Sequence, residues 1–135
     1  MHLLNNSPEL FAATIVAAFT GLMWIPIIAN RLLEMGPWKA LKNPQPDVRP
    51  HSDWAYRLAC AHRNAIENLC VFAPLAVAVH LMNAGNSATA AAAWVFVSAR
   101  IAHAGIYTLG IPLLRTVAFF AGFGCQMTLF ARLLA

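Results

Sequence analysis

The stretch LFAATIVAAFTGLMWIPIIA, residues 10–29, decides the fold, because it contains no charged side chain. A transmembrane helix needs about 20 largely apolar residues to cross a hydrocarbon layer about 30 Å thick, so this stretch is long enough for one crossing. The whole chain agrees, since 60% of its 135 residues are hydrophobic and only 10% are charged. A water-soluble protein of this size rarely has so little charge. The sequence therefore predicts an integral membrane protein.

Three further apolar segments follow this stretch, separated by turn signals. We expect four membrane-spanning helices, over residues 8–33, 54–82, 88–107 and 113–134. Ser7 is suited to cap the first helix, and Pro26 is expected to bend its later half. Four prolines among polar residues predict an extended surface loop over residues 36–53, and Gly85 predicts the stop after the second helix. The predicted fold class is all-α, one four-helix bundle domain over residues 1–135.

The basic residues indicate how the chain crosses the membrane. Five of them lie in or directly beside the long polar connection between the first and second helices, whereas the turn over residues 82–88 contains none; the five are Arg31, Lys39, Lys42, Arg49 and Arg57. Cytoplasmic loops carry the excess of Lys and Arg, so the long connection should be cytoplasmic and both termini should be periplasmic. The net charge of +4 is spread along the chain without an aromatic-interleaved basic stripe, which argues against nucleic acid as a partner.

The sequence gives no support to a metal site. Cys60, Cys70 and Cys125 lie in or beside apolar segments and are expected to be packing residues. His62 and His103 do not match a zinc-ligand spacing.

Polar side chains recur in the apolar second and third helices. They are Arg63, Asn64 and Glu67 in the second helix and Arg100, His103 and Tyr107 in the third. At about 1.5 Å of rise per residue, these two sets reach similar depths measured from the turn over residues 82–88. Arg115 opens the fourth helix and Arg31 ends the first at the same cytoplasmic level.

Two interpretations of these polar residues stay open. Charged side chains inside a membrane usually face the bundle interior and find partners, so Glu67 is expected to pair with Arg63 or Arg100 as a purely structural contact. That pairing leaves an excess of arginine, which is stable only where water or an anion reaches it. The excess favours an anionic ligand.

Two blocks of sequence resemble a known family, the membrane-associated proteins in eicosanoid and glutathione metabolism (MAPEG). One block is Asn64-x-x-Glu67 in the second helix, and the other is Arg100-x-x-His103-x-x-x-Tyr107 followed by Arg115-Thr116. The resemblance covers nearly the whole chain and is greatest to bacterial members with a Trp24-Ile25-Pro26 first helix. It implies a homotrimer in the inner membrane with glutathione bound between subunits.

The resemblance also implies roles for individual residues. Glutathione, as co-substrate, would be bound by Arg63, Asn64, Glu67, Arg100, His103, Tyr107 and Thr116. Arg115 would activate the thiol, and Arg31 matches a second basic position near the reaction. The expected activity is a glutathione-dependent transferase or peroxidase that acts on small lipophilic electrophiles from the bilayer.

One departure from the family pattern supports an alternative. Many family enzymes have an arginine where this chain has Cys60. The alternative is a non-catalytic MAPEG-like membrane protein that binds an anionic ligand or serves as an assembly subunit. A small exporter is a weaker third reading, because no discontinuous helix pair is apparent.

Overall fold

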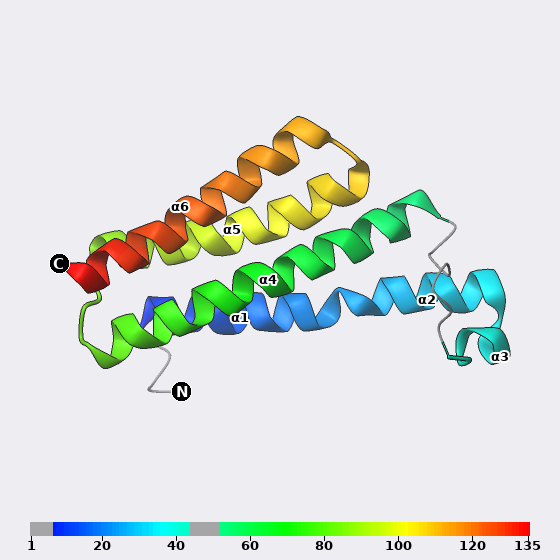
Figure 1. Ribbon diagram of the computed structural model, residues 1–135, viewed down its shortest axis with the longest axis horizontal. Helices are drawn as coiled ribbons and strands as arrows, with labels where there is room; N and C mark the ends of the chain where they lie inside the picture. Colours follow the sequence, from blue (N-terminus) through cyan, green and yellow to red (C-terminus); the bar gives the residue numbers. More distant parts are fainter. Residues whose placement is uncertain (1–6, 44–51) are drawn as a thin grey trace.

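The computed structural model describes residues 7–43 and 52–135, and the regular elements in these two ranges are all helices (Figure 1). The helices are α1 (Pro8–Leu22), α2 (Trp24–Met35), α3 (Pro37–Ala40), α4 (Asp53–Leu81), α5 (Ser87–Leu109) and α6 (Pro112–Leu134). By length and composition, four helical segments can span a membrane: α1 and α2 together, α4, α5 and α6. The chain is therefore an all-α, multi-pass integral membrane protein, and the four expected spans are confirmed.

The first span begins at the predicted cap and is interrupted near its centre. The side-chain oxygen of Ser7 accepts a hydrogen bond from the backbone N–H of Leu10 at 3.4 Å. The helix breaks at Met23, between α1 and α2. Proline has no N–H and its ring crowds the carbonyl four residues earlier, so Pro26 cannot continue the ladder to Leu22. The helix is interrupted nearly one turn before the proline, and the bend itself stays a prediction.

Polar and small residues define the turns between the later helices. Asn83 ends α4 in the left-handed region (φ 52°), so the expectation that Gly85 supplies this stop is wrong. Asparagine visits this conformation more readily than other residues with a side chain. Asn86 then caps α5 in a reciprocal box with Thr89, and Gly110 (φ 77°) ends α5.

The first connection contains a helix that the sequence analysis did not expect. Residues 36–53 were predicted to form an extended loop, but Pro37–Ala40 form the short helix α3. Pro37 occupies the first helical position, where its missing N–H costs nothing, and Gly36 before it adopts a positive φ of 75°. The rest of that prediction, for residues 44–51, lies outside the described residues.

Glu34 joins the two ends of this connection. One of its carboxylate oxygens accepts hydrogen bonds from the Asn30 side-chain amide at 2.8 Å, the Ser52 backbone N–H at 2.9 Å and the Ser52 hydroxyl at 2.6 Å. The C-terminal part of α2 is thereby attached to the residue that precedes α4.

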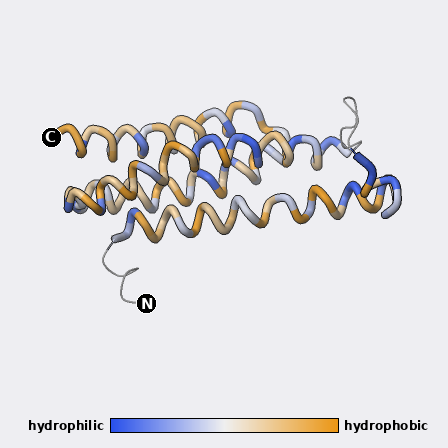
Figure 2. Tube along the Cα trace, turned by 60° about the horizontal axis from the view of Figure 1, so that its bottom comes forward, coloured by the Kyte–Doolittle hydropathy of each residue, from blue (hydrophilic) through white to orange (hydrophobic). Residues whose placement is uncertain are grey.

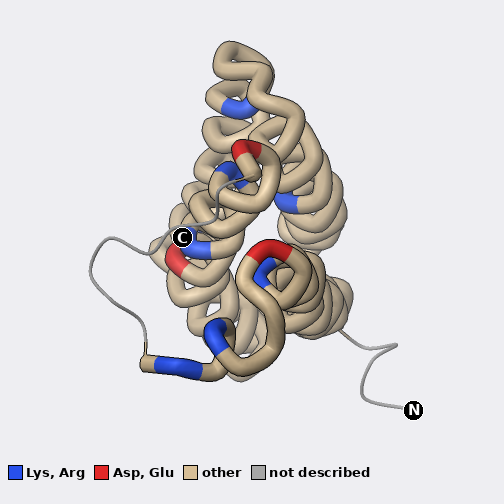
Figure 3. The backbone as a smooth tube through the Cα atoms, turned by 90° about the vertical axis from the view of Figure 1, so that its right-hand side faces the viewer, with Lys and Arg blue, Asp and Glu red and all other residues tan. Residues whose placement is uncertain are grey.

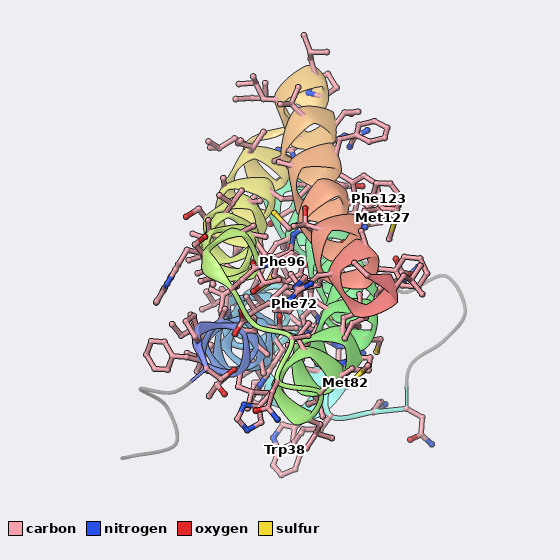
Figure 4. All side chains as sticks on the ribbon, turned by 90° about the vertical axis from the view of Figure 1, so that its left-hand side faces the viewer. Trp38, Phe72, Met82, Phe96, Phe123 and Met127 are labelled. Carbon is pink, nitrogen blue, oxygen red and sulfur yellow. The ribbon has the colours of Figure 1, made fainter. Side chains whose placement is uncertain are left out.

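The spans pack as a bundle in which α5 is central. It packs against α6, α4 and α1, while α1 and α6 lie on opposite sides and make no contact within the described residues (Figure 1). Phe72 of α4 and Phe96 of α5 stack in the core with ring centroids 3.9 Å apart (Figure 4). Most of the helical surface is apolar, and hydrophilic residues occur at the end that carries α3 and within the bundle (Figure 2). Such a distribution fits helices surrounded by lipid.

A buried acid joins two helices at the opposite end of the bundle. Glu9 of α1 is only 2% exposed. Its carboxylate accepts hydrogen bonds from the Thr89 hydroxyl at 2.6 Å and from the Ser7 hydroxyl at 3.2 Å. Both contacts lie in the first turns of α1 and α5, where the helix dipole stabilises negative charge.

Candidate functional site

Arg100 is the centre of the polar interior. Its side chain lies on α5 and is 2% exposed. One terminal nitrogen donates to the carbonyl oxygens of Ala118 at 3.0 Å and Phe119 at 3.5 Å on α6, and the other donates to the side-chain oxygen of Asn64 on α4 at 3.4 Å. The Nε atom is buried without a partner among the described residues. One guanidinium therefore connects three spans and retains a free donor.

A glycine makes room for this guanidinium. A methyl group built on Gly122 of α6 would overlap the terminal nitrogen of Arg100 and would lie 2.8 Å from its Cζ atom. The absence of a side chain allows α6 to approach the arginine closely, as small residues do in membrane bundles. Sequence reasoning gave no role to Gly122.

A chain of amides extends this network along α4 and α6. The Asn68 amide donates to the backbone oxygen of Asn64 at 2.9 Å and to its side-chain oxygen at 3.3 Å. The Gln126 amide donates to the backbone oxygen of Asn68 at 3.1 Å. Both Asn68 and Gln126 are buried, and sequence reasoning missed both. The sequence contained a signal for each residue. Asn68 lies four residues after Asn64, so both fall on the same face of α4. Gln126 is a polar residue within a largely apolar helix.

A second polar group lies where α5 ends and α6 begins. The His103 and Tyr107 rings meet edge to face with centroids 5.6 Å apart. The Arg115 guanidinium lies over the Tyr107 ring, 4.6 Å from its centroid. His103 is buried, while Tyr107 and Arg115 are half-buried. The structure thus joins these three predicted site residues, which lie nearer the α3 end than Arg100.

The predicted residues Arg63 and Glu67 lie on the surface of a single chain. Both are exposed, and neither forms an ion pair within the described residues. The expected pairing of Glu67 with Arg63 or Arg100 is therefore wrong for one chain, because Glu67 points outward on α4 while Arg100 is enclosed by α4, α5 and α6.

Glu67 lines a groove between α4 and α6. The groove has a volume of about 350 Å³, with polar groups from Asn64, Asn68 and Gln126 and apolar groups that include Phe123 and Met127. Figure 4 shows Phe123 and Met127 on the outer side of α6, away from the core pair Phe72 and Phe96.

Two predicted residues stand apart from both groups. Arg31 is half-buried in α2, which packs against α1, α3 and α4 but not against α5 or α6 in the described ranges. The Arg31 Nε is buried without a described partner. Thr116 is exposed, and its hydroxyl donates to the Pro112 carbonyl of its own helix at 3.1 Å. One chain therefore brings neither residue to the polar interior.

The arrangement is suited to an anion. Neither Arg100 nor Arg115 has a carboxylate within 4 Å among the described residues, so no acidic side chain there offsets either guanidinium charge. Looking onto the α3 end, Figure 3 shows Lys and Arg on several helices and fewer acidic residues. Guanidinium groups bind carboxylates with paired, charge-assisted hydrogen bonds, and the neighbouring amides offer further donors.

A known protein family matches most of the chain. The family model described as "MAPEG family" matches residues 10–135. No curated protein and no solved structure matches the chain.

Proposed function

The chain belongs to the MAPEG family, whose members commonly use glutathione, and from this membership we propose that it is a membrane-embedded glutathione-dependent transferase or peroxidase. Its substrates are small lipophilic electrophiles that enter from the bilayer. Glutathione is the co-substrate.

The observation that carries this proposal is the pair of arginines without carboxylate partners. The two arginines come from adjacent spans. Arg100 is 2% exposed and lies in a low-dielectric environment, where an uncompensated charge is costly, and Arg115 is half-buried at the end of the bundle. Glutathione has two carboxylates and one ammonium, so it is net anionic and offsets this charge. Asn64, His103, Tyr107 and Arg63 supply further polar contacts in the proposed site, and Glu67 suits the ammonium.

The proposed chemistry depends on a guanidinium beside the glutathione sulfur. Positive charge lowers a thiol pKa from about 8.5, so more of the nucleophilic thiolate is present at neutral pH. In the transferase reaction the thiolate forms a carbon–sulfur bond, the leaving group departs with its electron pair, and the thiol proton passes to water. In the peroxidase reaction two glutathione molecules become the disulfide, and a hydroperoxide becomes an alcohol and water.

The surface position of Glu67 supports a homotrimer. An exposed carboxylate in the middle of a membrane span is unfavourable against lipid, so intramembrane charges normally face protein or a water-filled cavity. The groove that Glu67 lines therefore faces another copy of the chain in our proposal, and a bound glutathione lies between the two. The neighbouring copy also brings Arg31 and Thr116 within reach of the site. The assembly resides in the bacterial inner membrane with both termini periplasmic.

Arg115 is the residue to test, because it lies at the cytoplasmic end, where a water-soluble co-substrate arrives. Detergent-purified protein is mixed with glutathione, and thiolate absorbance is measured in the ultraviolet at neutral pH. We expect a thiolate signal in the native protein, its loss in Arg115→Ala with glutathione still bound, and partial recovery in Arg115→Lys. Lysine keeps the charge but lacks the planar set of donors.

The alternatives predict different spectra. If native protein binds glutathione without thiolate formation, the chain is a non-catalytic member that binds an anion, which is the role that Cys60 in place of the family arginine favours. If Arg115→Ala leaves the thiolate absorbance unchanged, Arg115 is an ordinary interface residue. Arg31 then becomes the next candidate for thiol activation.

A further inference from the structure

Arg57 reaches from α4 to the end of α5. Its Nε atom donates to the carbonyl oxygen of Thr108 at 2.9 Å. A methyl group built on Gly110 would lie 3.3 Å from the Arg57 Cζ and Nε atoms, so the guanidinium covers this glycine closely. Asp53, one turn earlier on α4, lies 3.9 Å from an Arg57 terminal nitrogen. The arginine therefore occupies a defined position over the turn between α5 and α6.

The carbonyl that Arg57 contacts lacks its ordinary helical partner. The last carbonyls of a helix have no donor within the helix, and a left-handed C-terminal residue satisfies two of them. Here the N–H groups of Gly110 and Ile111 bond to Tyr107 and Ile106. The donor for Thr108 would come from residue 112, which is proline and has no N–H. Arg57 supplies the missing donor, and its positive charge complements the helix C-terminus.

This turn connects the two members of the Tyr107–Arg115 pair. Tyr107 lies in the last turn of α5, and the Arg115 N–H donates to the Ile111 carbonyl in the first turn of α6 at 3.3 Å. The stacking of Arg115 on Tyr107 therefore requires that the turn over residues 110–112 holds α6 at a fixed angle to α5. Gly110, with φ 77°, is the least constrained residue of that turn.

We propose that Arg57 is a positioning residue, which holds the turn between α5 and α6 and thereby places the Arg115 guanidinium. The effect of Arg57 on catalysis rests on the proposed function, whereas its effect on the turn does not. Arg57 itself contacts the turn and not the glutathione.

The structural part is tested by hydrogen exchange on the full chain in detergent. Arg57→Gln should raise the exchange rate of the peptide covering residues 108–116 about tenfold, since a charge-assisted hydrogen bond to a helix end is lost. Arg57→Lys should recover part of the protection from exchange. If Arg57→Gln folds poorly, the exchange of Arg57→Lys is compared with that of the native protein instead. The matched control is Arg132→Gln, because the Arg132 Nε donates to the Ala84 carbonyl at 3.0 Å at the other end of the bundle. That variant should leave residues 108–116 unchanged.

The catalytic part is tested with glutathione and a chlorodinitrobenzene. Arg57→Gln should lower kcat about tenfold to a hundredfold, because misplacing a catalytic group by about 1 Å has costs of this size, while KM for glutathione stays nearly constant. Unchanged exchange in Arg57→Gln overturns the proposal, and so does a raised KM with unchanged kcat, which would make Arg57 a ligand contact. If native protein forms no thiolate, the proposed function fails while the exchange result still decides the role of Arg57.

Discussion

Replacement of Gly122 by alanine tests whether the Arg100 network determines how closely α6 packs. The added methyl group overlaps the guanidinium, so Arg100 must move and weaken its 3.0 Å bond to the Ala118 carbonyl. Loss of a hydrogen bond from a charged donor costs about 1.5 to 3 kcal/mol, and alanine regains about 1 kcal/mol through its higher helix propensity. We expect Gly122→Ala to lower the free energy of unfolding in detergent by about 0.5 to 2 kcal/mol from this difference.

The same helix contains a matched control. Gly124 is two residues away, and a methyl group built there meets nothing within 4 Å. Gly124→Ala should therefore be neutral or slightly stabilising. A double variant with Arg100→Leu should make Gly122→Ala equally harmless, because the overlapping guanidinium is gone. Equal unfolding free energies for Gly122→Ala and Gly124→Ala in the native background would refute the reasoning.

Three further results are expected. Single cysteines at Asn43 and Gly85, in a background without the native cysteines, should react with a membrane-impermeant thiol reagent from opposite sides of the membrane, and labelling from one side would contradict the topology. Thr89→Val should lower the thermal unfolding midpoint, because the buried Glu9 loses its 2.6 Å donor; an unchanged midpoint would show that the contact contributes nothing. Glu67→Leu should weaken trimer formation or glutathione affinity, measured by light scattering and calorimetry, and the proposed interface fails if both persist.

The spans of the fold were predictable from sequence because their determinants are local. A charge-free stretch of membrane length, a proline inside it and capping residues between helices each act within a few residues. The errors were local as well. Asn83 ends α4 in place of Gly85, since asparagine tolerates the left-handed region. Pro37 starts a short helix within the first connection, although prolines usually indicate an extended loop.

The candidate site was predictable only in part. Residue spacing places Asn64 and Glu67 on α4, but the rotation of α4 against α5 and α6 decides which of them faces inward. That rotation depends on packing between spans, so Asn64 contacts Arg100 while Glu67 is exposed. Gly122 and Gln126 matter because α6 packs closely against Arg100 of α5 and Asn68 of α4. No local sequence pattern predicts how closely two spans pack.

The bonds between Glu34 and Ser52 have a practical consequence for protein engineering. They hold the end of α2 to the start of α4 directly, so the register of these two spans does not rely on the chain that links them. Lengthening a closed loop costs only about 0.6 kcal/mol for each doubling. An epitope or fluorescent domain inserted between Asn43 and Ser52 should therefore leave the bundle intact, which makes this connection the natural place for a reporter on the cytoplasmic side of the proposed topology.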